Sequence, residues 1–219
     1  TQTAQGRILL DYAVAQPVMN DGCDVIGMKQ LPTSNFQLPT PNFQLPTSNV
    51  QRLTSSAETA ALVNGGLSHI VEMDDLDRAS VLHPGTVVIP TALAVAQRER
   101  KSGRDFLAAI VLGYEVAIRI GEAVGKTHYF YFHNTATCGV FGAAAAAGWL
   151  MNLSAEQMVW ALGNAGTMSA GLWEFNADGA MSKHLHAGRA AQSGVLAADL
   201  ARRGFTGARR ILEGERGFF

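Results

Sequence analysis

The segment that most restricts the fold is an uncharged stretch in the second half of the chain. No formally charged residue lies between Lys126 and Glu156, and the most apolar part, from Cys138 to Met151, consists mainly of alanine and glycine. Such small residues let neighbouring helices approach closely, so residues 141–150 are expected to form a helix at the centre of a helical pack. The run is shorter than the roughly 20 apolar residues that cross a bilayer, which favours a buried helix over a membrane span.

Helix signals continue on both sides of this segment. Ser102 begins a capping arrangement, after which apolar residues recur at spacings of three and four, as in an amphipathic helix. Pro90 suits the first turn of a helix, and no segment alternates polar and apolar residues convincingly. The fold class is therefore predicted to be all-α, a compact multi-helix domain, with further helices over 91–100, 102–118, 156–168 and 182–203.

Composition restricts the classes of function. With 47% hydrophobic and 16% charged residues the chain can bury a sizeable core, and its net charge of -1 provides no positive field for nucleic acid. Cys23 and Cys138 show neither zinc-ligand spacing nor a disulfide framework, and the N-terminus carries no secretory signal pattern. We expect a cytoplasmic protein without nucleic-acid or membrane partners.

Residues 31–51 consist of three copies of a seven-residue unit, LPTSNFQ, LPTPNFQ and LPTSNVQ. Proline at the second position of each copy forbids a continuing helix, and the Thr, Ser and Asn content favours extended or turn conformations. We interpret the repeat as a surface loop inserted into a helical domain that covers residues 1–219. A proline-rich docking segment is the alternative.

Ionisable residues interrupt the apolar helical sequence at three places, and burying them unpaired would be unfavourable. The first place runs from Asn64 through Asp74 to His83. Within it Asn64, Ser68 or His69, and Glu72 are spaced to share one helical face. The neighbouring carboxylates repel one another, which raises a pKa or requires a cation, unless water simply solvates them.

The other two places each combine imidazole with a helix start. His133, Asn134 and Thr135 precede the alanine-glycine helix, either as capping residues or as a binding site for a substrate carboxylate. Lys183 and His186 are neighbours on one face at the beginning of the last helix. Cations in a first turn oppose the helix dipole, so an anion from the substrate or from the acidic cluster is expected to compensate them.

A metal site is the competing interpretation of these clusters, because histidine and carboxylate side chains are common ligands. No HExxH or comparable spacing supports such a site, so we predict no metal. The residues that could form one are His69, Asp74, Asp75, His83 and His133.

Five segments follow one another over roughly residues 57–219. They read AALVNGGLSHIVEMDDLD with HPG after it, SGRDFLAAIVLGYEVAIRIG, FHNTATCGVFGAAAAAG, WEFNADG and SKHLHAGRAAQSGVLAADLARRGFTGARRILEGERGFF. Taken together they resemble the MmgE/PrpD family of 2-methylcitrate dehydratases, iminodisuccinate epimerases and cis-aconitate decarboxylases. No single segment is a strict signature, but five in register are very specific. Relatives commonly have aspartate in place of Glu72 and proline in place of Asn134.

The resemblance implies a helical domain that forms a homodimer and needs no metal or organic cofactor. Full-length relatives continue into a smaller α+β lid domain, with the active site between the two, and this chain, ending at Phe219, is expected to lack the lid. The implied enzyme is a lyase or isomerase that dehydrates, epimerises or decarboxylates a small di- or tricarboxylate. By position the catalytic residues are Glu72, Asp74, His83, His133 and Lys183, and we expect Asn64, Thr135 and His186 to bind substrate.

These chemistries require a side chain that stabilises enolate-like charge and one that moves a proton on carbon. Lys183 is expected to fill the first role, and His83 or His133 the second. The acidic pair Glu72 and Asp74 would orient a histidine or protonate a leaving hydroxyl. The alternative to an enzyme is a truncated, non-catalytic helical module that dimerises or binds carboxylates.

Overall fold

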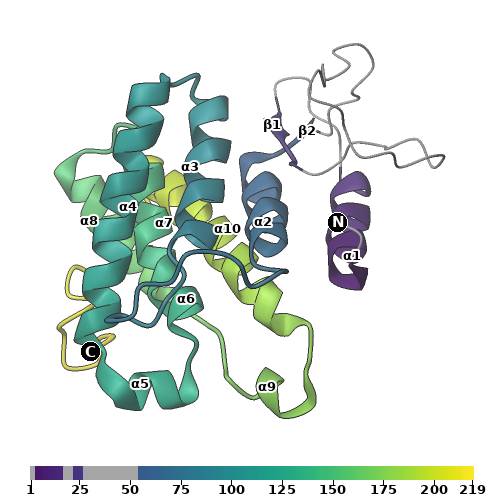
Figure 1. Ribbon diagram of the computed structural model, residues 1–219. Helices are drawn as coiled ribbons and strands as arrows, with labels where there is room; N and C mark the ends of the chain where they lie inside the picture. The colour runs from purple at the N-terminus through teal and green to yellow at the C-terminus, as the bar shows by residue number, and fades with distance from the viewer. Residues whose placement is uncertain (1–2, 17–21, 27–53) are drawn as a thin grey trace.

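The computed structural model describes residues 3–16, 22–26 and 54–219, so the repeat at 31–51 lies outside the described residues. Within these ranges the regular structure is helical apart from one short antiparallel ladder, which confirms the all-α class. None of the described helices is both long and apolar enough to cross a membrane. The elements follow in the order α1 (Ala4–Val14), β1 (Cys23–Asp24), β2 (Thr54–Ser55), α2 (Ala57–Ser68), α3 (Gly85–Arg98), α4 (Gly103–Ala123), α5 (Gly125–Tyr131), α6 (Asn134–Thr137), α7 (Gly139–Leu150), α8 (Ala155–Thr167), α9 (Phe175–Asp178) and α10 (Ser182–Arg202) (Figure 1).

Helix α7 lies at the centre of the bundle, as its alanine and glycine content predicts. Only Trp149 among its residues escapes burial, and α3, α4, α8 and α10 all pack against it. A Cβ on Gly142 would collide with the carbonyl oxygen of Gly113 on α4, so only glycine permits this approach of the two backbones. The close contacts made by small residues therefore set the spacing of the core helices.

The packing of α2 on α10 depends on Gly188 in the same way. A Cβ there would collide with the carbonyl oxygen of Leu62 and lie 3.1 Å from the amide nitrogen of Gly66. We expect Gly188→Ala to lower the free energy of unfolding by about 1–3 kcal/mol, because backbone atoms cannot move aside. Gly103→Ala is the control, since a Cβ there meets nothing within 4 Å. Urea unfolding of both variants checks the prediction, and equal stabilities would contradict it.

Local signals predicted most helix starts correctly. The capping boxes at Ser102 and Ser154 are present, with Asp105 and Gln157 completing them, and both begin the helices expected there. The last helix starts at Ser182 as predicted.

Two predictions about helix boundaries are wrong. Pro90 lies inside α3 and not in its first turn, because the helix already begins at Gly85. A proline cannot donate to the carbonyl of Thr86. The hydroxyl of Ser68 lies 3.4 Å from that oxygen, but its shorter hydrogen bond, of 2.8 Å, goes to the carbonyl of Gly65. His69 and Glu72 do not share a helical face with Asn64, because α2 ends at Ser68; only Asn64 and Ser68, four residues apart in α2, do so.

The ends of several helices meet at one end of the bundle. Helix α2 finishes there, α10 begins there, and the short helices α6 and α9 lie beside them (Figure 1). The chain segment between α2 and α3 crosses the same end, and it carries the acidic residues that the sequence singled out. The fold thus gathers all three ionisable clusters into one region.

Candidate active site

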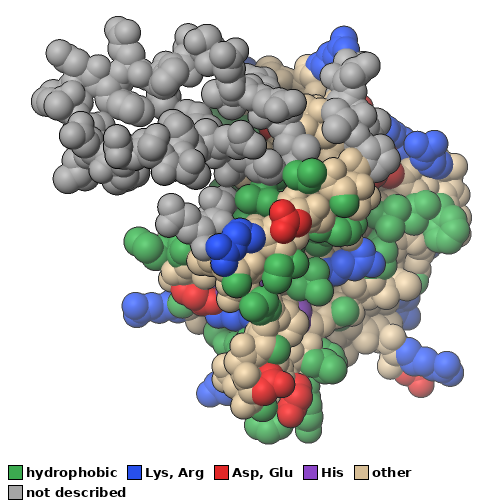
Figure 2. All heavy atoms as spheres, turned by 90° about the vertical axis from the view of Figure 1, so that its right-hand side faces the viewer, with side chains coloured by type: hydrophobic (Ala, Val, Ile, Leu, Met, Phe, Trp, Pro, Cys, Tyr) green, Lys and Arg blue, Asp and Glu red, His purple; other side chains and the backbone are tan. Residues whose placement is uncertain are grey.

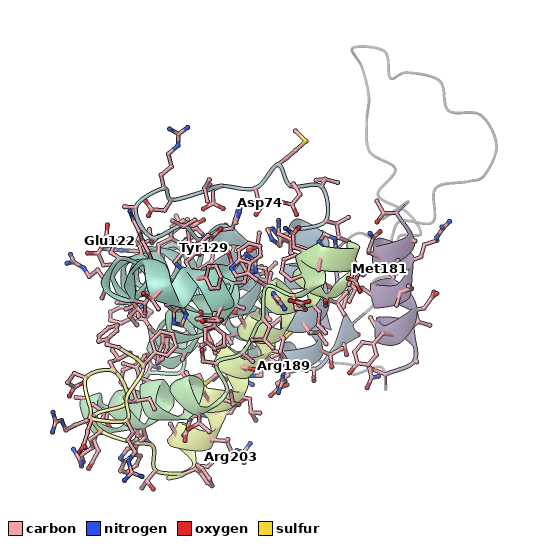
Figure 3. The ribbon with its side chains drawn as sticks, turned by 90° about the horizontal axis from the view of Figure 1, so that it is seen from below. Asp74, Glu122, Tyr129, Met181, Arg189 and Arg203 are labelled. Atoms are coloured by element: carbon pink, nitrogen blue, oxygen red, sulfur yellow. The ribbon has the colours of Figure 1, made fainter. Side chains whose placement is uncertain are left out.

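Asp74 lies between two histidines in the segment that follows α2 (Figure 3). His69 is completely buried, and its Nδ1 lies 2.8 Å from Oδ2 of Asp74 in a hydrogen bond. His83 Nδ1 lies 2.9 Å from the same oxygen, but it is not aligned for a hydrogen bond and has no other partner among the described residues. Burial lowers the pKa of His69, and the Asp74 carboxylate opposes this effect. One carboxylate is thus shared by two imidazoles.

His133 and His186 form a second pair at the start of α6 and α10. The two Nδ1 atoms lie 3.2 Å apart, so one ring donates and the other accepts. Trp173 and Phe175 cover His133, with ring centroids 5.0 and 6.2 Å away. Burial, assisted by repulsion from His186, lowers the pKa of His133 to about 2. The His133 imidazole is therefore neutral at physiological pH.

Lys183 and Glu72 form the third pair. The ammonium donates to both carboxylate oxygens, at 2.7 and 2.5 Å, so the acidic cluster compensates the cation in the first turn of α10 as expected. Glu72 adopts a φ of 55°, a left-handed backbone that non-glycine residues seldom take. Such strained residues concentrate at functional sites, where the surrounding structure maintains them.

These three pairs lie close enough to influence one another. The rings of His69 and His133 stack with centroids 5.9 Å apart. Burial and His186 have the largest effects on the pKa of His133, and the charges of His69, Lys183 and His83 lower it further. Little histidine surface is visible on the face seen in Figure 2, in keeping with the burial of the cluster. The structure therefore brings His83, His133 and Lys183 together around one site, and their catalytic roles stay predictions.

The other acids of the cluster have partners of their own. Asp75 accepts the backbone N–H of Gly85 at 3.2 Å. Asp77 accepts from the hydroxyl and the backbone N–H of Ser80, and these hydrogen bonds lower the pKa of Asp77. Separate partners relieve the mutual repulsion that the sequence suggested.

Two of the three predicted substrate-binding residues make structural contacts. The hydroxyl of Thr135 accepts the backbone N–H of His83 at 3.0 Å, which fixes His83 against α6. The amide of Asn64 accepts from the backbone of Ile26 and donates to the carbonyl of Asp24. Asn64 and Thr135 thus hold backbone in place, whereas His186 lies directly against His133. Substrate binding by the three residues stays a prediction.

A pocket of about 420 Å³ lies between α2 and α3. Asp74 and Asp75 line it together with apolar side chains such as Leu67 and Ile89, but none of the histidines does. Asn64, one of the predicted substrate-binding residues, also lines the pocket, so Asn64 and the two acids connect the pocket with the candidate site.

Sequence reasoning did not identify the contact of His69 with Asp74 or the covering of His133 by Trp173. His69 stands five residues before Asp74, at the end of a helix. Nothing in this spacing predicts a hydrogen bond between the two side chains, which the fold shows. Trp173 belongs to the segment WEFNADG, which was noted for its resemblance alone. In both cases the contact is formed by the tertiary fold, and no local sequence pattern indicates it.

The group that could hold a metal ion, among the described residues, is His69, Asp74 and His83. A ligand atom of each lies within 4.8 Å of the others. The hydrogen bond between His69 and Asp74 engages one ligand atom of each, whereas Nδ1 of His83 and Oδ1 of Asp74 have no hydrogen-bond partner among the described residues. That the site works without a metal stays a prediction.

The buried neutral histidines predict sensitivity to acid. Burial lowers the pKa of His69, His133 and His186, whereas in the unfolded chain histidine protonates near pH 6.5. Below that pH the unfolded chain binds more protons, so stability is complete above about pH 6.5 and falls as the pH is lowered. His133 alone is expected to contribute a loss of about 1.4 kcal/mol for each pH unit below this point.

Urea unfolding of the protein and of His133→Gln between about pH 7.5 and 5.5 checks this prediction, since most carboxylates titrate below that interval. The variant should lose less stability per pH unit. Equal slopes for the two proteins would contradict a neutral His133.

Known proteins of similar sequence identify the family. The MmgE/PrpD N-terminal domain matches residues 22–219. The chain is 33% identical over 171 residues to the cis-aconitate decarboxylase-like protein oryM of Aspergillus oryzae, covering 74% of this chain and 35% of that protein. It is 35% identical over 169 residues to human cis-aconitate decarboxylase and 33% identical to that of Aspergillus terreus, covering 73% of this chain and 34% of each relative. The chain thus spans about a third of the length of these curated relatives, and it belongs to the MmgE/PrpD family.

Proposed function

We propose that this chain is the helical part of a lyase that acts on a small di- or tricarboxylic acid by moving a proton on carbon beside a carboxylate. The observation that carries the proposal is the convergence of a lysine, a histidine paired with a carboxylate and a buried neutral histidine on one site. The enzymatic names of the relatives support it. Isomerisation of such an acid would use the same groups.

Lys183 is the residue that we assign to the substrate carboxylate. An ammonium has three donors, and the contacts to Glu72 leave one for an incoming anion. The first turn of α10 adds the positive end of the helix dipole. Charge that develops on the carboxylate as an enolate forms is stabilised by the same ammonium.

His83 is the residue that we assign to proton transfer. Its side chain is 18% exposed and lies 2.9 Å from the carboxylate of Asp74, which can stabilise the imidazolium. His133 is buried and stays neutral, so it suits a hydrogen bond to the substrate and not a proton carrier. This distinction supports His83 over His133, a choice that the sequence left open.

Decarboxylation is the first reaction to test, because the named relatives are decarboxylases. In that reaction the bond from carbon to the departing carboxylate breaks, carbon dioxide leaves, and the electron pair left on carbon takes a proton from His83. In dehydration His83 removes the proton, the electron pair forms the double bond, and the hydroxyl beta to the carboxylate takes a proton from an acid such as Glu72 or Asp74 and leaves as water. In epimerisation His83 removes the proton, the electron pair stays on the substrate, and a proton returns to the opposite face.

Incubation of the protein with cis-aconitate, 2-methylcitrate and iminodisuccinate, followed by NMR, tests the proposal. Turnover of one of these acids, unchanged by a chelator, is the expected result. Absence of turnover would overturn it, and calorimetric binding of the same acids would then indicate a carboxylate-binding module.

We also propose that the chain forms a homodimer, which is the arrangement that the family resemblance implies. Light scattering coupled to size exclusion tests this directly. A mass equal to that of one chain at all concentrations would contradict it.

A further inference from the structure

Among the described residues, Asp74 accepts a hydrogen bond from one histidine although two histidines contact its carboxylate. Oδ2 accepts from His69 and lies 2.9 Å from Nδ1 of His83, whereas Oδ1 is buried and has no partner among the described residues. A carboxylate can accept several hydrogen bonds through both oxygens. A proton on Nδ1 of His83 would therefore obtain a partner if the carboxylate turned slightly, at the expense of its bond to His69.

His69 is placed to act on the site without touching a substrate. It is completely buried at the end of α2, and its ring stacks on His133 and meets His184 edge-on, with centroids 6.1 Å apart. Its Nε2 is also buried and has no partner among the described residues, which is consistent with a neutral ring that carries its hydrogen on Nδ1. His69 reaches the groups assigned to the chemistry by two contacts, its hydrogen bond to Asp74 and the approach of its ring to that of His83, with centroids 4.9 Å apart. The second contact needs a ring but no donor.

We propose that His69 is a positioning residue that holds the Asp74 carboxylate and thereby limits how strongly His83 retains a proton. The inference rests on the proposed function, in which His83 moves the proton. When the substrate C–H bond breaks, the proton passes to Nε2 of His83, the electron pair stays on the substrate, and Nδ1–H of His83 donates to Asp74. Because Asp74 also accepts a hydrogen bond from His69, its hydrogen bond with His83 is weaker than it would be if His83 were the sole donor. His83 therefore releases its proton more readily.

Titratable groups from other elements of the fold also lie near His83. His69 ends α2, and His133 precedes α6 and is influenced by the charges of both His83 and Lys183. Lys183 on α10 is paired with Glu72, so its charge is largely compensated. Asp74 is thus the carboxylate in direct contact with His83. How strongly His83 keeps its proton depends on whether this carboxylate accepts from His83 alone or from His69 as well.

Two substitutions separate the hydrogen bond from the ring. His69→Asn keeps an N–H close to the position of Nδ1 and removes the ring, whereas His69→Phe keeps a ring that stacks on His133 and removes the donor. In His69→Phe the Asp74 carboxylate no longer accepts from residue 69 and should stabilise the protonated form of His83. The acid limb of the pH–rate profile should then move to higher pH by about one unit. In His69→Asn the limb should stay in place.

A readout that needs no turnover keeps this inference separate from the proposed function. NMR of the His83 ring in the protein without substrate should show protonation at higher pH in His69→Phe than in the protein or in His69→Asn. The shift in His69→Phe should disappear when Asp74→Asn is added. If this pattern is found but no acid is turned over, the positioning role holds and the proposed function fails.

Equal behaviour of His83 in both variants would overturn the inference, as would a shift that persists without Asp74. Circular dichroism of each variant confirms folding. If His69→Phe does not fold, His69→Leu, which also lacks the donor, replaces it with the same expected shift.

Discussion

Replacing Lys183 with alanine should lower turnover by at least about 10²–10³-fold and leave the melting temperature nearly unchanged. The loss is expected because, in the proposed function, the ammonium faces both the substrate carboxylate and the enolate-like charge. The stability should change little, because the side chains of Lys183 and Glu72 are 22% and 46% exposed and such pairs contribute only about 0–1 kcal/mol. The cation also opposes the dipole of α10, so its removal relieves an unfavourable interaction.

Arg189→Ala is the matched control for this prediction. It removes a cation from the same helix, at an exposed residue whose side chain bonds to Gln192 (Figure 3). Its turnover should equal that of the unmodified protein. A large fall in the melting temperature of Lys183→Ala would show that the lysine is structural, and turnover close to normal would show that another group binds the carboxylate.

The pairing of Lys183 with Glu72 shows what the sequence could not predict. Both residues were expected to act, yet they stand 111 residues apart, and nothing local indicates that their side chains meet. The contact depends on the close approach of α2 and α10, where a Cβ on Gly65 would lie only 3.0 Å from the Cα of Gly188. Glycine content predicts that helices can approach, but not which helices do so.

Helix starts were predictable for the opposite reason, because their causes are local. Ser102 and Ser154 each bond within three residues, so the signal lies in the sequence itself. The end of α2 was mispredicted because the spacing of polar residues from Asn64 to Glu72 suggested that the helix continues. The hydrogen bond between His69 and Asp74 instead accompanies a turn away from the helix. Local chemistry thus fixes the helices, and tertiary contacts fix the site.

Replacing His83 with glutamine should lower turnover by about 10²–10⁴-fold, the usual contribution of a positioned acid or base. The fold should tolerate the change, because Nδ1 of His83 has no hydrogen bond to lose among the described residues and the backbone N–H still donates to Thr135. His133→Gln should retain the acid limb of the pH–rate profile, since a neutral His133 does not carry the proton, whereas His83→Gln should lose that limb.

His128→Gln is the control for the His83 variant, because His128 is a partly buried histidine that contacts Thr137 outside the pairs described above. Its kcat should stay within about threefold of the unmodified value. If His133→Gln and not His83→Gln removes the acid limb, the two roles are reversed, and the buried imidazole must gain its proton together with the substrate. If both variants keep the limb, neither histidine moves the proton, and the base must come from another part of the protein.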